Sequence, residues 1–333
     1  MSAIRTGVIG AGALGYHHVR LLKAISGPLF AGFYDSRPAR AAQVAEELGV
    51  RAFDRVESLL DAADALTVVV PTPAHYAVAK PALERGKHLL IEKPVAASLD
   101  EADELLAIAA RTGSVVQVGH VERFNRAVRA ALPHVDAPRF IESDRLAPFN
   151  PRGSDVAVVL DLMIHDIDLV LTLVGGHVAH VSAVGVPVLT PTVDIANARL
   201  SFASGAVANI TSSRVSREKM RKIRIFQQSG YLSLDLGAGS GEFFRMRRDV
   251  DMAALVKAPM ALEAFVERIP LEAPDGEPLK LELESFLSAV RGERAVEVTG
   301  ADGREALEVA LRIVREIERT LPALHGPANR SRA

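Results

Sequence analysis

Residues 4–35 constrain the fold of this chain most, because they combine a strand, a glycine-rich turn, a helix and a second strand. The apolar run 4–9 leads directly into Gly10-Ala-Gly-Ala-Leu-Gly15, and a helical stretch follows. Glycines at these positions permit a tight turn, close approach of a pyrophosphate to the backbone, and close packing of helix on strand. The start of the helix then offers unpaired N–H groups to phosphate oxygens. The pattern predicts a dinucleotide-binding unit.

The end of the second strand indicates which dinucleotide binds. Asp35 lies 20 residues after Gly15, where an acceptor for a ribose 2′-hydroxyl is expected. A carboxylate there favours NAD, because it would repel the 2′-phosphate of NADP. Arg37 and Arg40 follow closely and could bind that phosphate instead, so NADP is the alternative cofactor. Asp35 could also simply cap the next helix.

Strands and helices continue to alternate as far as residue 121. Further strands are predicted at 50–53, 65–70, 88–92 and 115–121, and helices at 16–25, 39–48, 56–62, 75–85 and 100–111. This alternation predicts a doubly wound parallel sheet of the α/β class, so residues 1–122 are expected to form an NAD(P)-binding Rossmann domain. The predicted cofactor-binding residues are Gly10, Ala11, Gly12, Ala13, Leu14, Gly15, Asp35, Arg37, Pro71, Thr72, His75, Glu92 and Lys93.

The pattern changes after residue 122. Strands are predicted at 139–146, 181–188, 196–202, 207–213, 219–227 and 231–236, and helices at 155–174, 281–290 and 302–321. Strands joined by turns, such as Ser204-Gly205, predict an α+β domain at 123–322 with a mixed, largely antiparallel open sheet. Residues 251–277 fit no clear element. The small, polar and basic residues 323–333 are expected to be a disordered tail.

Lys93 is the first candidate for chemistry. It follows an apolar strand that reads as fully buried, and Pro94 stops the ladder directly after it. A lysine is costly to bury unless it is paired or has a task. In open α/β sheets, ligands bind at the carboxyl ends of the strands. We therefore expect Lys93 to be a catalytic group.

The predicted helix 155–174 supplies the second candidate. It is apolar almost all the way round, which is typical of a buried helix. Its polar residues Asp161, His165, Asp168 and Thr172 nevertheless follow one face, with only Asp166 off that line. Such a stripe indicates an active-site wall with His165 as acid or base. An internal His–Asp pair and a metal site are the alternatives, and no metal is predicted.

Composition excludes several classes of function. The 333 residues carry 39 basic and 41 acidic side chains, so the net charge of −2 favours neither a nucleic-acid nor a membrane partner. The absence of cysteine excludes disulfides, thiolate catalysis and Cys-ligated metals, and it fits a reducing cytoplasm. The first strand begins too early to leave room for a signal peptide. No apolar run reaches the ~18 residues of a membrane span.

The glycine turn, Glu92-Lys93-Pro94 and Asp161-x-x-x-His165 together resemble the Gfo/Idh/MocA oxidoreductases, over residues 1 to about 320. This resemblance implies a Rossmann domain joined to a mixed-sheet substrate domain, with Lys93, Asp161 and His165 at the site of hydride transfer. Residues 118–125, 145–149 and 194–200 resemble the UDP-N-acetylglucosamine 3-dehydrogenases of that family. That closer likeness implies oxidation of the sugar at C3, before a transamination that leads to lipid A.

The predicted substrate is therefore a small-molecule nucleotide sugar. Its diphosphate would need basic groups, and Arg123 and Arg145 are better candidates than residues 214–222, which could be a solvated edge. The predicted catalytic residues are Lys93, His165 and Asp161, and either Lys93 or His165 could be the base. The predicted substrate-binding residues are Lys93, Arg123, Asn125, Arg145, Asp161 and His165.

Two alternative functions and the size of the oligomer remain open at the level of the whole protein. The substrate could instead be another nucleotide sugar, an inositol or a free sugar. The chain could also be a dinucleotide-binding sensor that does no turnover, because a Rossmann fold does not fix function. An open sheet in the second domain would be covered by another subunit, which predicts a homo-oligomer, a dimer or a tetramer.

Overall fold

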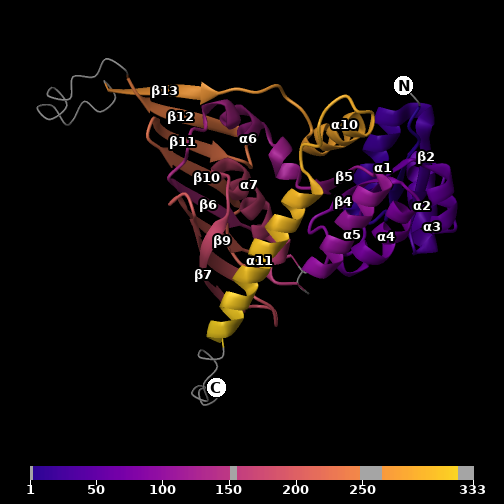
Figure 1. The fold of residues 1–333 in the computed structure, drawn as a ribbon, viewed down its shortest axis with the longest axis horizontal. Coiled ribbons are helices and arrows are strands. Elements are labelled where there is room, and N and C mark those ends of the chain that lie inside the picture. Colours follow the sequence, from indigo (N-terminus) through magenta and orange to yellow (C-terminus); the bar gives the residue numbers. More distant parts are fainter. Residues whose placement is uncertain (1–2, 151–155, 248–264, 322–333) are drawn as a thin grey trace, which may run out of the picture. The chain divides into compact units, whose positions relative to one another are not determined.

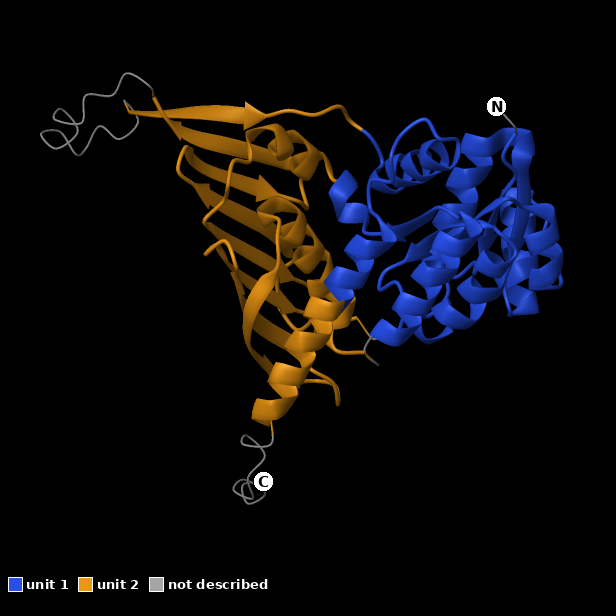
Figure 2. Cartoon of the chain, viewed as in Figure 1, with its two compact units in different colours: residues 1–124, 276–307 blue, residues 125–275, 308–333 orange. Residues whose placement is uncertain are grey.

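The computed structural model describes residues 3–150, 156–247 and 265–321, and it divides into two compact units (Figure 2). Residues 1–124 and 276–307 form the first unit, and residues 125–275 and 308–333 form the second. Residues 276–307, which we expected in the second domain, therefore group with the first. The second division falls inside helix α11 (Gly300–Thr320). The predicted tail 323–333 lies outside the described residues.

The first unit is built on a five-stranded parallel sheet, as predicted (Figure 1). The strands are β1 (Thr6–Ile9), β2 (Phe30–Tyr34), β3 (Ala65–Val68), β4 (His88–Glu92) and β5 (Val116–Gly119), in the order β2-β1-β3-β4-β5. The chain order reverses at β1, which lies between β2 and β3, and ligands bind at such switch points. The predicted strand 50–53 is wrong, because it makes only the single bridge between Phe33 and Ala52.

Six α-helices accompany this sheet. They are α1 (Ala13–Ser26), α2 (Pro38–Leu48), α3 (Val56–Ala62), α4 (His75–Glu84), α5 (Leu99–Thr112) and α10 (Pro278–Val290). Local chemistry sets their ends: in α5, the Ser98 hydroxyl accepts from the N–H of Glu101, and Gly113 adopts a left-handed conformation after the last turn. The α10 side chains Leu283, Phe286 and Leu287 are buried in the same core as Val8 and Phe33. That shared core explains why residues 276–307 group with the first unit.

The second unit contains an eight-stranded sheet. Its strands are β6 (Phe140–Leu146), β7 (Val178–Val186), β8 (Ile195–Phe202), β9 (Val207–Ser213), β10 (Met220–Gln227), β11 (Gly230–Asp235), β12 (Ser240–Met246) and β13 (Val266–Leu271), in the order β13-β12-β11-β10-β6-β9-β8-β7. Only β6 and β9 pair in parallel, so the prediction of a mixed, largely antiparallel sheet is confirmed. The predicted turn at Ser204-Gly205 joins β8 to β9, with Gly205 at a φ of 81°.

Helices cover one face of the eight-stranded sheet. They are α6 (Arg126–Ala131), α7 (Ile164–Val174) and the second half of α11 (Figure 1). Along β6, Ile141, Ser143 and Arg145 are buried, whereas Phe140 and the alternate residues after it are only half-buried. This alternation is typical of a sheet with one covered and one open face.

The predicted helix 155–174 is not regular. Within the described residues, a π turn (η5, Val159–Met163) precedes α7. A π turn carries one more residue per hydrogen-bonded ring than an α-helix, and such turns are frequent at functional sites. Asp161 lies within the π turn, and His165 lies in the first turn of α7.

Candidate active site

The glycine turn at the end of β1 has the geometry that the sequence predicts. Gly10 has a φ of 96°, and a Cβ there would lie 2.3 Å from the Val69 carbonyl oxygen. A Cβ on Gly15 would lie 2.1 Å from the Gly10 carbonyl oxygen. A Cβ on Gly12 would instead meet nothing closer than Arg37 Nη2 at 3.8 Å. Gly10 and Gly15 therefore close the turn, whereas Gly12 leaves its backbone accessible.

The N-terminus of α1 is suited to an anion. Gly12 is the N-cap without a side-chain capping bond, and the first turn of α1 holds no acidic residue. Ala13 and Leu14 are exposed there. The unpaired N–H groups and the helix dipole favour a phosphate at this position. The residues present therefore fit the pyrophosphate of a dinucleotide.

Asp35 is buried at the end of β2 and already organises the glycine turn. One carboxylate oxygen accepts the Ala11 N–H at 2.8 Å, and the other accepts the Arg37 N–H at 2.9 Å. The Arg37 guanidinium binds the same carboxylate at 3.0 and 3.1 Å. Burial would raise the pKa of Asp35, but the hydrogen bonds from Arg37 and Ala11 outweigh it, so the pKa is lowered. Arg40 binds the Ala11 carbonyl oxygen at 2.8 Å.

Lys93 follows β4 directly and is half-buried. The preceding Glu92 is buried, with one carboxylate oxygen 3.2 Å from Nε2 of the fully buried His18 of α1. Its other oxygen accepts the Lys93 N–H at 3.3 Å. A Cβ on Gly119 of β5 would lie 2.9 Å from this carboxyl group, so glycine is needed there. Glu92 thus fixes the backbone that carries Lys93, and the Lys93–Pro94 peptide is cis.

His75 lies beneath the same strand ends. It is buried, with Nδ1 2.8 Å from the Pro94 carbonyl oxygen and Nε2 2.9 Å from the Val70 carbonyl oxygen. Burial is the largest influence on the pKa of His75, and it lowers that pKa despite the two carbonyl groups. His75 therefore ties the end of β3 to the segment after Lys93. Pro71 is exposed and Thr72 is half-buried beside it.

In the second unit, Asp161 and His165 are both half-buried, while Asp168 is buried. The predicted polar stripe is wrong at one position. Thr172 is exposed and donates to the Asp168 carbonyl oxygen at 2.8 Å. Asp166, which we placed off the stripe, is buried and accepts two hydrogen bonds from Arg145 at 2.6 and 3.1 Å. This pair joins α7 to β6.

Arg123 and Asn125 have local partners. Arg123 is not at the end of a strand but in a short 3-10 turn (η3, Val121–Phe124) after β5. Its guanidinium lies 3.5 Å from Asp302 and 3.4 Å from the Glu297 carbonyl oxygen. Asn125 caps α6 by accepting the Ala127 N–H at 3.0 Å, and it donates to the Leu236 carbonyl oxygen at 2.9 Å. Their binding of substrate stays a prediction.

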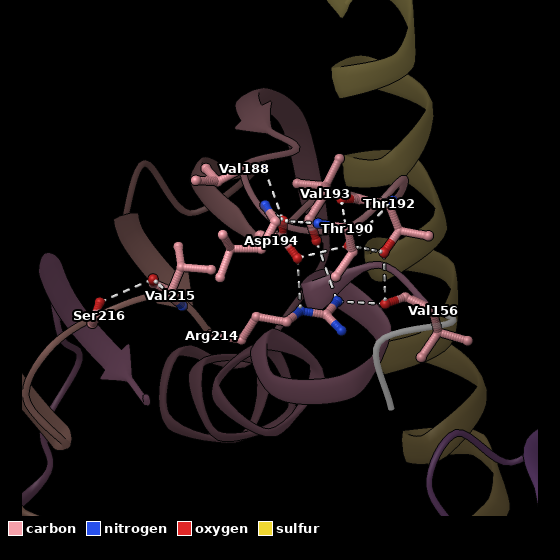
Figure 3. Close-up of polar contacts among 11 residues, drawn as sticks. Val156, Val188, Thr190, Thr192, Val193, Asp194, Arg214, Val215 and Ser216 are labelled. Carbon is pink, nitrogen blue, oxygen red and sulfur yellow. Dashed lines mark hydrogen bonds and ion pairs between the residues drawn. The ribbon is translucent and has the colours of Figure 1, made fainter. Parts of the chain in front are cut away.

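Sequence reasoning missed a buried pair near the π turn. Arg214 and Asp194 are 4% and 0% exposed, and Arg214 Nε lies 3.6 Å from Asp194 Oδ1 (Figure 3). Arg214 is thus not part of a solvated edge, whereas Arg217, Lys219 and Lys222 are exposed. The sequence signal was weak, because a single arginine at the start of a basic run resembles its solvated neighbours.

Among residues 3–150, 156–247 and 265–321, no group of three or more His, Asp or Glu side chains could hold a metal ion. Over the same ranges, no helix combines the length and the apolar character that crossing a membrane requires.

Comparison with known proteins accounts for both units. Residues 4–120 match the oxidoreductase family with an NAD-binding Rossmann fold, and residues 126–233 match the GFO/IDH/MocA C-terminal domain. The chain is 40% identical over 319 residues to the UDP-N-acetylglucosamine 3-dehydrogenase of Acidithiobacillus ferrooxidans, which covers 96% of this chain and 98% of that protein. A solved structure of that organism's UDP-N-acetylglucosamine 3-dehydrogenase matches with a TM-score of 0.87 at 39% identity, over 96% of this chain and 100% of the other.

A second relative has a different named substrate. The scyllo-inositol 2-dehydrogenase (NAD(+)) of Bacillus subtilis is 32% identical over 232 residues, which are 64% of this chain and 68% of that protein. A levoglucosan dehydrogenase solved with NADH and levoglucosan has a TM-score of 0.80 at 18% identity, which shows that the fold is shared.

Proposed function

Because the chain belongs to the Gfo/Idh/MocA oxidoreductase family, we propose that it oxidises a secondary sugar hydroxyl with NAD, at C3 of UDP-N-acetylglucosamine. The observation that carries this proposal is the 40% identity, over almost the whole of both chains, to a UDP-N-acetylglucosamine 3-dehydrogenase. The product would be the 3-keto sugar. A transamination towards lipid A would consume it, and the cytoplasm, where NAD and nucleotide sugars are available, would be the location.

The first unit supports NAD over NADP. We assign the pyrophosphate to the N–H groups of Gly12, Ala13 and Leu14, and the ribose hydroxyls to Asp35. The lowered pKa keeps Asp35 anionic, and an anion there repels a 2′-phosphate. Arg37 already forms two hydrogen bonds with the Asp35 carboxylate, which offsets part of its attraction for that phosphate. Pro71, Thr72, His75 and Glu92 then shape the cofactor site without contributing charge to the phosphates.

The reaction needs a group that takes the hydroxyl proton. When bound, the nicotinamide ring accepts the hydride from the carbon. We propose Lys93 as the group that holds or removes the proton of the hydroxyl, with His165 as the competing base and Asp161 orienting the substrate. Glu92 is not a base in this proposal, because its two oxygens are engaged by His18 and by the Lys93 N–H. Arg123, Asn125 and Arg145 are the proposed substrate contacts outside this set.

The open face of the second unit supports a homo-oligomer. Phe140, Phe226, Tyr231 and Phe244 form one row across four neighbouring strands, with ring centroids 5.6, 5.5 and 4.7 Å apart. The row beside it carries Glu142, Arg224 and Glu242, where Glu142 pairs with Arg224 and Glu242 pairs with Arg268 at the end of the aromatic row. A two-fold interface buries the same surface on both subunits, and an apolar row flanked by both signs of charge can pair with itself in this way. We propose that a second copy of the chain covers this face in a dimer or a tetramer.

The test is a ligand screen followed by turnover. Thermal shift with UDP alone, UDP-N-acetylglucosamine, UDP-glucose, scyllo-inositol and myo-inositol identifies the substrate class, since a ligand that binds only the folded state raises the melting temperature. NADH formation with each compound then identifies the reaction, and the product is checked for a 3-keto group. Turnover with UDP-N-acetylglucosamine at a kcat/KM at least tenfold above that for the inositols is the expected result.

The inositol alternative rests on the 32% identity to a scyllo-inositol 2-dehydrogenase. Turnover with an inositol, with no shift from UDP, would favour it over the nucleotide sugar. Binding of NAD without turnover of any sugar or polyol would instead favour the sensor.

A further inference from the structure

Arg214 holds together three segments that are distant in sequence (Figure 3). Its backbone directly follows β9, and its N–H donates to the Asp194 carbonyl oxygen at 2.9 Å. Its guanidinium Nη2 donates to the carbonyl oxygens of Val156 and, at 3.2 Å, of Val193. The three segments are therefore the end of β9, the loop before β8, and the entrance to the π turn.

Asp194 binds the backbone of the loop that precedes β8. One of its oxygens accepts three successive backbone N–H groups, from Val188, Leu189 and Thr190, at 2.8, 2.7 and 2.9 Å. Its other oxygen accepts the Thr190 hydroxyl at 2.8 Å and faces Arg214. A buried carboxylate with this many donors and a buried guanidinium is fully compensated. Asp194 thus fixes both the loop and the orientation of Arg214.

Arg214 binds the backbone at the point where the helical hydrogen bonds begin. The Val156 carbonyl oxygen is bound by Arg214 and, at 3.3 Å, by the Thr192 hydroxyl. The next carbonyl, of Ala157, accepts the N–H of Leu160 at 3.0 Å and of Asp161 at 3.2 Å. The Val158 N–H is bound by the Val193 carbonyl oxygen at 2.9 Å. The Asp161 N–H therefore binds the carbonyl that directly follows, along the chain, the one bound by Arg214.

We propose that Arg214, oriented by Asp194, is a positioning residue that sets the place of Asp161 and of the π turn for catalysis. The inference rests on the proposed function, in which Asp161 and His165 act on the substrate. Arginine suits the task because its planar guanidinium can reach two carbonyl oxygens and a carboxylate at once, whereas the lysine ammonium is a point charge on a flexible stem. A displacement of about 1 Å in such an element can cost about 10² in rate.

The test compares Arg214→Met and Arg214→Lys with the native enzyme and with Arg312→Lys. Arg312 is the matched control, because it also binds two backbone carbonyl oxygens, of Val178 and Ala179, but from α11. Amide hydrogen exchange over residues 156–165 is measured without substrate, and kcat, KM and the dissociation constant of NAD are measured over a range of pH. Arg214→Lys keeps the test usable if Arg214→Met does not fold.

The expected result is faster exchange over residues 156–165 in the Arg214 variants, with kcat about tenfold lower in Arg214→Lys and about 10² lower in Arg214→Met. The dissociation constant of NAD stays within twofold, and Arg312→Lys changes neither exchange in this segment nor kcat. Unchanged exchange over residues 156–165, or faster exchange with native kcat, overturns the positioning role. If the proposed function is wrong, the native enzyme turns over no sugar. The comparison of amide hydrogen exchange over residues 156–165 would still show whether Arg214 holds this segment.

Discussion

At the scale of single residues, Lys93 and the Glu92 that precedes it have different surroundings. Glu92 is buried against His18 and holds the Lys93 N–H, while the lysine itself is half-buried. The Glu92 carboxylate thus fixes the backbone, and Lys93 is the residue of this pair to which we assign the proposed chemistry.

Replacing Lys93 with Met tests that division. We expect turnover to fall by at least about 10², because a general acid or base typically contributes about 10²–10⁴. The dissociation constant of NAD, measured by fluorescence titration, should stay within threefold. The control is Lys87→Met, which changes a lysine just before the amino end of β4. Near-native turnover by Lys93→Met would remove Lys93 from the chemistry and leave His165 as the base.

Asp35→Ser tests the choice of cofactor. The substitution removes the anion and the partner of Arg37, so kcat/KM for NAD should fall about tenfold or more while that for NADP rises. Steady-state kinetics with both cofactors measures the ratio.

The native preference for NAD should also be constant as pH changes. The lowered pKa of Asp35 means that its negative charge is present above the ordinary aspartate pKa of about 3.9 and is lost only as the pH falls below it. An equal preference for NADP in the native enzyme at any pH from about 5 to 9 would contradict this role of Asp35.

At the scale of elements, most of the fold can be predicted from the sequence because alternation and apolar runs are local signals. Two strands, β12 and β13, could not be predicted from the sequence. Strand β12 begins within the glycine-rich stretch 237–241, which hides a strand pattern, and β13 contains Pro270. Proline is tolerated there because β13 is an edge strand of the sheet. Neither placement can be read from a short window of sequence.

The candidate site was predictable where one strand or turn defines it, as at the glycine turn and Lys93. The π turn was not, because what holds its entrance is Arg214, 58 residues further along the chain. The buried ion pair of Asp166 could not be predicted for the same reason, because its partner Arg145 comes from β6. A helical projection assumes one regular periodicity and contains no information about distant partners.

Arg145→Met tests the buried pair that joins α7 to β6. Both side chains are nearly inaccessible, at 4% and 2% exposure, so removing one leaves an uncompensated buried charge. We expect the free energy of unfolding to fall by about 3–5 kcal/mol, measured by urea unfolding with circular dichroism. The matched control is Arg224→Met, which breaks the more exposed Arg224–Glu142 pair and should cost about 1 kcal/mol or less.

A double variant completes this test. In Arg145→Met with Asp166→Leu neither charge remains, so the double variant should be more stable than Arg145→Met alone. A loss no larger than that of the Arg224 control would show that the Arg145–Asp166 pair does not hold the helix.

At the scale of the whole molecule, the first unit is not a continuous piece of chain. Residues 1–124 alone lack α10, whose Leu283, Phe286 and Leu287 are at most 1% exposed in the core. Burial of three such side chains contributes roughly 5–9 kcal/mol, which is comparable with the total stability of a domain. We expect residues 1–124 to lack a cooperative thermal transition by circular dichroism, whereas 1–124 joined to 276–307 by a flexible linker should fold and bind NAD.

A variant of the joined chain provides the control. Leu283→Asp places a charge in the same core and should abolish the transition again. Cooperative unfolding of residues 1–124 by themselves would show that α10 is dispensable for the first unit.

The oligomer is tested on the open face of the eight-stranded sheet. Phe226→Lys places a charge between Phe140 and Tyr231 in the aromatic row, so the protein should change from an oligomer to a monomer by light scattering. Leu132→Lys is the control, because Leu132 is exposed in the 3-10 turn after α6 and lies off the sheet. A native protein that is already monomeric would contradict the proposed assembly.

The late return of residues 276–307 has a consequence for how the protein is made. A ribosome adds about 5–20 residues per second, so roughly 15–60 s pass before residue 307 is complete. The parallel sheet emerges early in that interval, yet the core surface that α10 covers stays exposed until synthesis has reached Val290, the last residue of α10. A nascent-chain chaperone that recognises apolar surface would therefore find its longest-lived target on the first unit, although that unit begins at the N-terminus.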